Sequence, residues 1–311
     1  MPKLAAIGLV ALSVLAPSVL AQAATADTAA TDVTIETSTG PATLAVAPET
    51  VAVFDLAALD TLTALGVPIA GVPNNLYLPM FDDLTKGATP VGTIFEPDFE
   101  ALAVMQPDLI VVGGRSSEQL GPVSDIAPAI DMTLIGDDLV TEARDRIAAY
   151  GALFGREDRA TALTRQLDDK LSAARDAAAD RGTALILLTN GGKISAYGRD
   201  SRFGWIHEAL ELPQAHPGLD VAPHGQAVSF EFIAETDPDW LLVVDRGAAI
   251  GADGESARAT LDNPIVAETK AAQSGQIIYL DAGPLYISGG GAASMMHTLD
   301  ELTEAFSATE S

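Results

Sequence analysis

The chain of 311 residues contains no cysteine. Disulfide bonds and cysteine-ligated iron–sulfur clusters are therefore excluded, and so is a lipid carried on an N-terminal cysteine. A chain of this length buries enough apolar surface to fold without such cross-links. The absence of cysteine is compatible with export, provided that the protein is stabilised by its core alone.

Basic residues are also scarce. The 17 lysines and arginines are outnumbered by 43 aspartates and glutamates, which gives a formal net charge of −26. Nucleic acid and anionic membrane surfaces need a basic face, so neither is expected as a partner. Because basic residues are so few, an arginine at a predicted ligand-binding position is more conspicuous than it would be in a neutral chain.

Only one long apolar run occurs, and it lies at the N-terminus. Residues 1–23 combine Lys3, an apolar stretch broken by Pro17, and an A-x-A pattern at Ala21-Gln22-Ala23. This pattern is typical of a cleavable secretory signal peptide, whereas a buried N-terminal helix is the alternative. We expect a free periplasmic protein that is not lipid-anchored.

Motifs of catalysis are missing as well. No Gly-x-Gly-x-x-Gly follows a predicted strand, the "ISGGG" stretch lacks the Lys and Ser/Thr of a phosphate-binding loop, and neither G-x-S-x-G nor H-E-x-x-H occurs. Without a nucleophile and base signature, the sequence does not predict an enzyme.

An internal repeat is the strongest positive feature. "FEALAVMQPDLIVVGGR" spans residues 99–115 and "FEFIAETDPDWLLVVDR" spans residues 230–246, an offset of 131 positions. Each copy predicts a short helix, a Pro-Asp turn and an apolar strand that ends near an arginine. Such an apolar run suits a parallel strand covered on both faces. The repeat therefore predicts two similar halves.

The remaining pattern predicts the α/β class. Strands and helices alternate at the spacing of βαβ units, which favours mainly parallel sheets. Residues 156–182 are rich in Ala, Leu, Arg and Asp and predict one long amphipathic helix, whose arginines we expect on a solvated surface with Arg144 and Arg146. The predicted organisation is a signal peptide at 1–23, an N-terminal lobe at 24–155, a connecting helix at 156–182 and a C-terminal lobe at 183–311.

Two arginines are the leading candidates for ligand binding. Arg115 and Arg246 follow equivalent predicted strands, and ligands of parallel sheets bind beyond the carboxyl ends of the strands. Guanidinium groups stay charged and offer a planar set of donors to oxyanions. Arg202 is a third candidate, although neighbouring Arg199 could take its place. A single arginine could equally form a local salt bridge, so the argument depends on the repeat.

The sequence gives weaker evidence for the other candidate functional residues. Glu100 and Glu231 lie on the repeated short helices and could be ordinary exposed glutamates. His224 and Tyr286 lie in glycine-rich loops where a ligand could approach, and His216 also lies in a loop. His207 and His297 fall within predicted helices, where we expect structural roles.

Several stretches together resemble one family. "VAVFDLAALDTLTALGV", "VGTIFEPDFEALAVMQPDLIVVGGR", "LTNGGKISAYGRDSRFGWIHEALEL", "HGQAVSFEFIAETDPDWLLVVDR" and "IIYLDAGPLYISGGG" are similar to the periplasmic substrate-binding proteins of ABC importers for iron–siderophore complexes, especially the catecholate branch. The resemblance covers residues 32–306 and implies the class III fold, two α/β lobes joined by one long helix.

The resemblance also implies roles for single residues. In this branch three arginines hold the anionic ferric complex, and the matching positions are Arg115, Arg202 and Arg246. A histidine and a tyrosine can complete the coordination of Fe(III) when the siderophore is tetradentate, and these correspond to His224 and Tyr286. The acidic residues of the repeat correspond to those that dock on the permease, and they are Glu100 and Glu231.

The sequence thus predicts a non-enzymatic, monomeric receptor that delivers a ferric catecholate siderophore to an ABC permease dimer. It has no intrinsic cofactor, and Fe(III) arrives as part of the ligand. A binding protein for haem, cobalamin or a nearly neutral hydroxamate siderophore is the first alternative. A metal-cluster oxidoreductase subunit is the second, and the lack of cysteine argues against it.

Overall fold

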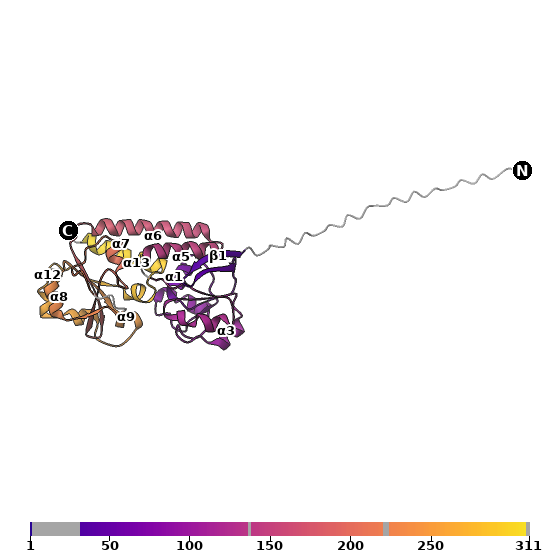
Figure 1. Ribbon diagram of the computed structural model, residues 1–311, viewed down its shortest axis with the longest axis horizontal. Helices are drawn as coiled ribbons and strands as arrows, with labels where there is room; N and C mark the ends of the chain where they lie inside the picture. The colour runs from indigo at the N-terminus through magenta and orange to yellow at the C-terminus, as the bar shows by residue number, and fades with distance from the viewer. Residues whose placement is uncertain (2–31, 136–137, 220–223, 309–311) are drawn as a thin grey trace. The chain divides into compact units, whose positions relative to one another are not determined.

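Two five-stranded sheets form the centres of two lobes (Figure 1). The computed structural model describes Met1 and residues 32–135, 138–219 and 224–308. Apart from Met1, the predicted signal peptide therefore lies outside the described residues. Residues 31–311 form one compact unit that contains both lobes.

The N-terminal sheet has the order β5-β4-β3-β6-β7, and all its strands are parallel. Its strands are β3 (Val51–Val53), β4 (Gly71–Val72), β5 (Thr89–Pro90), β6 (Leu109–Val112) and β7 (Ala129–Asp131). All four residues of β6 are buried, as the apolar run predicted for a strand covered on both faces. A separate antiparallel pair, β1 (Asp32–Thr37) and β2 (Gly40–Ala45), precedes this sheet.

The C-terminal sheet has the order β10-β9-β8-β11-β12. Its strands are β8 (Ala184–Asn190), β9 (Lys193–Tyr197), β10 (Gln226–Val228), β11 (Trp240–Asp245) and β12 (Ile277–Leu280). β8, β11 and β12 are parallel, whereas β9 runs antiparallel to both of its neighbours. The repeated strands β6 and β11 hold the same place in their sheets, next to the central strand.

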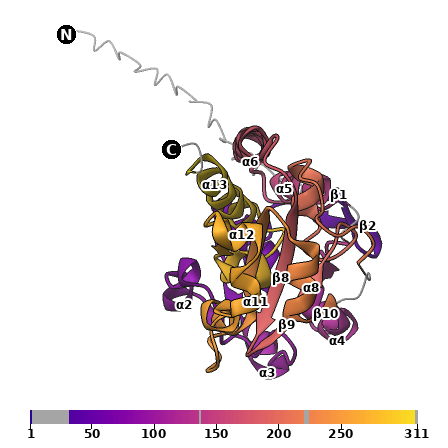
Figure 2. The same cartoon turned by 90° about the vertical axis from the view of Figure 1, so that its left-hand side faces the viewer.

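Helices cover both faces of each sheet. In the N-terminal half they are α1 (Leu56–Ala64), η1 (Pro79–Phe81), α2 (Leu84–Gly87), α3 (Phe99–Met105), η2 (Gly114–Gln119), α4 (Leu120–Ser124) and α5 (Leu139–Leu153). In the C-terminal half they are α7 (Trp205–Ala209), α8 (Phe230–Thr236), α9 (Arg246–Ile250), α10 (Ala257–Leu261), α11 (Pro264–Ala267), α12 (Lys270–Gln273), the π-helical η3 (Gly283–Ile287) and α13 (Ala292–Ala308). Figure 1 and Figure 2 show α8 and α12 on the side of the C-terminal lobe that is remote from the N-terminal lobe.

One long helix, α6 (Glu157–Ala178), runs along both lobes in Figure 1. Its buried side chains recur at helical spacing, with Leu163, Leu167 and Leu171 on one face. This face packs on α5 and α13. The helix begins one residue later than the predicted span. It ends four residues earlier, because Ala179 leaves the helical conformation with a ψ of 132°.

A single apolar core extends through α6 from one lobe to the other. It includes Leu59 of α1, Ile147 of α5, Leu167 of α6, Leu242 of β11 and Leu299 of α13. Two smaller clusters fill the outer faces of the two sheets. The fold is therefore two α/β lobes whose mutual arrangement is set by a shared core. Within the described residues, no helix is both long and apolar enough to span a membrane.

The arginines assigned to the solvated helix surface do not all lie there. Arg146 of α5 is half-buried, and its guanidinium donates to the backbone oxygens of Glu36 and Thr133 at 2.8 and 2.9 Å. Arg144 of α5 pairs with Asp168 of α6 at 2.6 Å. These arginines join elements that are distant in the sequence, which helical spacing alone does not reveal.

Candidate functional site

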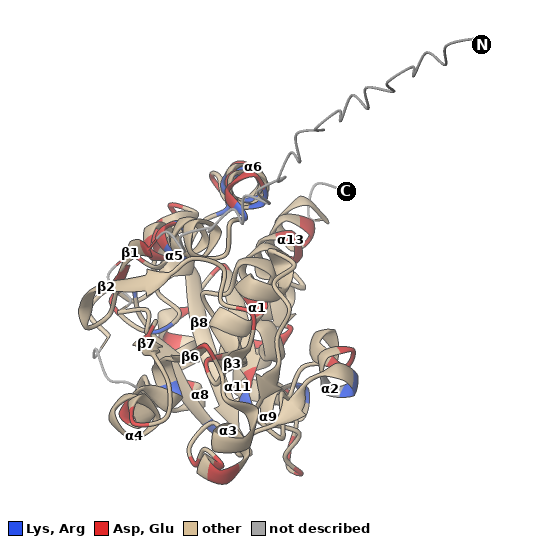
Figure 3. Ribbon diagram, turned by 90° about the vertical axis from the view of Figure 1, so that its right-hand side faces the viewer, with Lys and Arg blue, Asp and Glu red and all other residues tan. Residues whose placement is uncertain are grey.

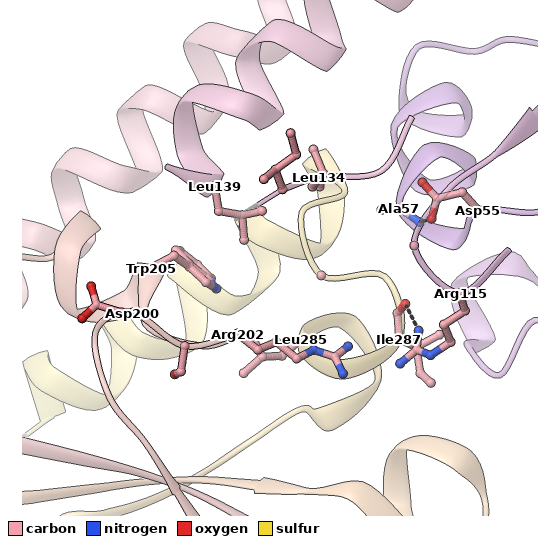
Figure 4. A pocket seen from close by; sticks show the side chains of 14 residues that line it. Asp55, Ala57, Arg115, Leu134, Leu139, Asp200, Arg202, Trp205, Leu285 and Ile287 are labelled. Atoms are coloured by element: carbon pink, nitrogen blue, oxygen red, sulfur yellow. Dashed lines mark hydrogen bonds between the residues drawn. The ribbon is translucent and has the colours of Figure 1, made fainter. Parts of the chain in front are cut away.

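A cavity of about 580 Å³ lies between the lobes (Figure 4). Arg115 enters it from the N-terminal lobe, and Arg202 and Trp205 enter it from the C-terminal lobe. Leu134, Ile135, Leu139, Leu285 and Ile287 supply apolar surface. The cavity thus combines guanidinium groups with an apolar wall, as sites for amphipathic ligands do.

Three arginines converge on Tyr286, which does not line the cavity itself but lies between the lining residues Leu285 and Ile287. The guanidinium carbons of Arg115, Arg202 and Arg246 lie 5.2, 4.3 and 6.0 Å from the ring centroid of Tyr286. Arg246 does not line the cavity itself, but its Nε donates to the phenol oxygen of Tyr286 at 3.1 Å. The structure therefore gathers all three predicted arginines around one side chain.

Backbone carbonyls of the segment η3 complete the cluster. Arg115 donates to the carbonyl oxygens of Tyr286 and Ile287 at 3.0 and 3.2 Å, which links the two lobes. Arg202 also donates to the carbonyl oxygen of Tyr286. Arg246 donates to the side-chain oxygen of Asn190, at the end of β8, at 3.3 Å.

The three arginines lie in different kinds of segment relative to the strands that precede them. Arg115 lies in η2, just after β6, and Arg246 begins α9 directly after β11, so both follow the predicted strand-end rule. Strand β9 runs antiparallel to β8, so the rule does not apply to Arg202. The loop between β9 and α7 carries Arg202 to Tyr286 instead. Arg199 lies 3.5 Å from Glu208, so Arg202 is the arginine that enters the cavity.

The cluster alters the acidity of its members. Burial would raise the pKa of Tyr286, but the hydrogen bond from Arg246 and the charges of Arg202, Arg246 and Arg115 outweigh it and lower the pKa of the phenol. Burial, together with the charge of Arg115, lowers the pKa of Arg202. The guanidinium groups repel one another, and an anion placed among them would relieve that repulsion.

A carboxylate that the sequence did not single out also lines the cavity. Asp55 caps α1 by accepting from the amides of Ala57 and Ala58, each at 3.3 Å. Burial raises its pKa to about 6; the two amides and Arg115 oppose this rise, and Asp131 adds to it. Asp55 directly follows the apolar stretch around β3, so the rule that found Arg115 would also have found it.

The other predicted residues lie away from the cluster. His224 is exposed in the turn before β10, and it is neither a lining residue nor a partner in the described contacts of the arginines and Tyr286. Glu100 on α3 and Glu231 on α8 are exposed. His207 is buried and contacts the carbonyl oxygen of Leu212 through Nδ1, which fits a structural role.

The fold and this interlobe cavity define a ligand-binding protein of two lobes. The chain belongs to the periplasmic binding protein family, whose model matches residues 51–284. Its solved neighbours have the class III fold of that family. The family comprises substrate-binding proteins and not enzymes.

Among known proteins, the chain is similar to the petrobactin-binding protein YclQ of Bacillus subtilis. It is 36% identical over 263 residues, which cover 83% of this chain and 82% of the relative. The crystal structure of YclQ superposes with a TM-score of 0.82 at 33% identity, covering 89% and 99% of the two chains.

Two further structures are comparably similar. The periplasmic catecholate-siderophore binding protein VctP of Vibrio cholerae has a TM-score of 0.82 at 29% identity, covering 88% of this chain and 99% of VctP. The siderophore binding protein BauB, bound to two molecules of acinetobactin and ferric iron, has a TM-score of 0.81 at 30% identity, covering 89% and 99%.

Proposed function

We propose that this protein is a receptor for an anionic ferric catecholate siderophore, which it binds between its lobes and delivers to an ABC permease. The convergence of Arg115, Arg202 and Arg246 on Tyr286 is the observation that carries the proposal. A ferric tris-catecholate is multiply negative, and each cation–anion pair at about 6 Å contributes about 3 kcal/mol at an effective dielectric constant of about 20. Among the similar proteins, VctP binds a catecholate siderophore and BauB binds a siderophore together with ferric iron, which supports a ligand of this kind.

Tyr286 has a second proposed role as a direct ligand of Fe(III). A lowered pKa favours the phenolate, which is a hard donor suited to Fe(III). His224 is the proposed second ligand for a tetradentate siderophore, and it would reach the iron only if its exposed turn closes over the cavity. Fe(III) is cargo here, bound chiefly by the siderophore.

The proposal also covers the export of the protein and its docking on the permease. Residues 1–23 would be removed on export, which leaves a monomeric periplasmic protein without a lipid anchor. Glu100 and Glu231, one on each lobe, would contact basic pockets of the permease dimer.

The proposal can be tested by fluorescence titration with ferric tris-catecholate. Trp205 lines the cavity, whereas Trp240 is buried elsewhere and donates to the carbonyl oxygen of Arg181 at 2.9 Å. We expect the complex to quench Trp205, and we expect Trp205→Phe to abolish the quenching. Absence of both quenching and bound iron would contradict the proposal.

Arginine variants distinguish a ferric catecholate from the alternative ligands. Arg202 lines the cavity, so Arg202→Ala removes about 3 kcal/mol of charge attraction, and the dissociation constant for ferric tris-catecholate should rise about 100-fold. A nearly neutral ferric hydroxamate should be affected much less. Equal losses for both ligands, or tight binding of haem or cobalamin, would favour the alternative function.

A further inference from the structure

Asparagine is rare in this chain, and one asparagine precedes a glycine. The asparagines are Asn74, Asn75, Asn190 and Asn263. Only Asn190 is followed by glycine, in the stretch "TNGGK". Asparagine is a chemically labile residue, and it is most labile before glycine, which has no side chain to shield its backbone nitrogen from the neighbouring amide.

Asn190 and Gly191 lie in a tight, exposed turn. Asn190 ends β8 and pairs with Lys193 of β9, so Gly191 and Gly192 form a two-residue hairpin loop. Their φ values of 52° and 73° are both positive, as such loops require. Asn190 and Gly191 are exposed, and a Cβ atom on Gly191 would meet no atom within 4 Å. Few neighbours therefore oppose a change of conformation at this pair.

The other asparagines are held more firmly. The side-chain oxygen of Asn75 accepts from the amide of Tyr77 at 3.0 Å. Asn263 caps α11 by accepting from the amide of Ile265 at 2.8 Å, and the residue after it is Pro264, whose nitrogen carries no hydrogen. Asn190 is thus the asparagine at which an attack by the following backbone nitrogen meets the least resistance.

The side chain of Asn190 contacts the arginine cluster. Its oxygen Oδ1 accepts from Nη1 of Arg246 at 3.3 Å, and Nε of the same arginine donates to the phenol of Tyr286 at 3.1 Å. A neutral amide leaves the positive charge of Arg246 available to an anion. A carboxylate at the same place would pair with the guanidinium in a charge-assisted hydrogen bond and offset that charge.

We propose that Asn190 is a site of deamidation and that the product of this reaction weakens the affinity of the receptor for anions. The nitrogen of Gly191 attacks the side-chain carbonyl carbon of Asn190 and forms a succinimide ring. The side-chain nitrogen leaves as ammonia and takes the proton of the Gly191 amide with it. Water then opens the ring at either carbonyl and leaves aspartate or isoaspartate, so water is consumed and ammonia is released in equal amounts.

The acidic composition makes the position of this new charge important. Basic segments are few beside acidic ones in Figure 3, so offsetting one arginine removes a large share of the positive charge near the cavity. One more carboxylate on the remote surface would change little, because salt screens distant exposed charges. The effect on affinity rests on the proposed function, whereas the deamidation itself does not.

Isotope labelling tests the modification without any ligand. The intact folded receptor would be kept at mildly alkaline pH in water labelled with heavy oxygen, and then digested with trypsin in ordinary water. The peptide of residues 182–193 contains Asn190 as its only amide side chain, and the peptide of residues 259–270 contains Asn263 as an internal reference. We expect the first peptide to lose nitrogen and gain heavy oxygen at least about tenfold faster than the second.

Variants test the consequence for the ligand. Asn190→Asp reproduces one product of the reaction, and we expect it to raise the dissociation constant for ferric tris-catecholate about tenfold. Thr161→Glu, which adds the same charge to the exposed side of α6, is the matched control and should bind like the parent protein. Asn190→Gln keeps an amide but closes a larger ring far more slowly, so it should bind normally and gain no label.

The possible failures are distinct. Equal labelling of the two peptides would show that Asn190 is not a deamidation site, and an affinity of Asn190→Asp equal to that of Thr161→Glu would show that the product does not act on the binding site. Either result overturns the inference and leaves the receptor function intact. Failure of the parent protein to bind ferric tris-catecholate would instead contradict the proposed function, and with it the effect on affinity.

Discussion

At the scale of single residues, Tyr286 shows how strongly its surroundings change the pKa of a side chain. Its ring lies within 6.0 Å of three guanidinium carbons, and its phenol accepts a hydrogen bond from Arg246. The repeat predicted Arg115 and Arg246, because it placed both after equivalent strands. It could not predict that they share one tyrosine, since Tyr286 lies outside the repeat and reaches them only through the fold.

Removal of Arg246 should make Tyr286 harder to ionise. Arg246→Ala deletes the hydrogen bond to the phenol and one of three nearby positive charges, so we expect the pKa of Tyr286 to rise. Phenolate absorbance during an alkaline titration measures this change. Burial raises the pKa of Tyr150, Tyr197 and Tyr279, so Tyr286 should ionise before them.

The variant Tyr286→Phe identifies the transition that belongs to this residue. If Arg246→Ala left the midpoint of that transition unchanged or lowered it, the proposed electrostatic coupling would be wrong.

A second residue, Asp60, connects the two halves of the chain from inside the core. This carboxylate of α1 is fully buried and accepts from the amides of Ala293 and Ser294 at 2.7 and 2.9 Å, and from the Ser294 hydroxyl at 2.7 Å. It thus caps α13 from 233 positions away in the sequence. Burial raises its pKa to about 6, although the hydrogen bonds from Ser294 and Ala293 act in the opposite direction.

Asp60 should make the protein more stable as the pH falls. Its pKa of about 6 in the folded chain exceeds the ordinary value of 3.8, so the folded state binds more protons than the unfolded state between these values. Its contribution is then fully present below pH 3.8 and is lost as the pH rises through 6. By linkage this contribution is at most about 3 kcal/mol.

Urea unfolding at several pH values between 4 and 7 measures the effect. We expect Asp60→Asn, which cannot titrate, to show a smaller gain in unfolding free energy on acidification than the parent protein. Equal pH dependence in the two proteins would show that Asp60 is ionised throughout this range.

At the scale of secondary structure, helix α6 illustrates a prediction that succeeded for a physical reason. Its alternation of leucines and charges over six turns is unambiguous, and the structure buries Leu163, Leu167 and Leu171 on one side. The π-helical segment Gly283–Ile287 is the opposite case. No periodic pattern predicts it, and its packing joins residues distant in the sequence: a Cβ atom on Gly283 would lie 2.5 Å from the side chain of Leu78, which would have to move.

Truncation of the buried face of α6 should destabilise both lobes. Leu167 is completely buried in the shared core, so Leu167→Ala should lower the unfolding free energy by about 2–5 kcal/mol. Arg165→Ala, on the exposed side of the same helix, should change it by less than about 0.5 kcal/mol. Chemical denaturation compares the two variants, and similar losses would mean that α6 is not held by its apolar face.

At the scale of the whole molecule, two electrostatic effects oppose each other. The chain carries a net charge of −26, while Arg115 and Arg202 line its cavity. An anionic ligand is therefore repelled at long range and attracted at short range. Salt screens the long-range term first, because exposed charges farther apart than about 10 Å are largely screened at about 0.1 M salt.

Association of an anionic ligand should consequently become faster when salt is added. We expect the association rate constant of ferric tris-catecholate, followed by stopped-flow quenching of Trp205, to rise between low and moderate ionic strength. A neutral ferric hydroxamate is the control and should show little dependence. A rate constant that falls with salt would show instead that the arginines dominate the field at a distance.

The two-lobed α/β class, the long connecting helix and the paired arginines of the repeat can be predicted from the order of the residues alone. These follow from apolar periodicity and from the place of a residue relative to its own strand, both of which are local properties. Tertiary structure decided that Arg202 and not Arg199 enters the cavity, that Tyr286 lies among the guanidinium groups, and that Asp60 caps a distant helix. Such contacts join residues far apart in the chain, and only the tertiary fold brings them close together, within one lobe for Arg202 and Tyr286 and between the halves of the chain for Asp60 and α13.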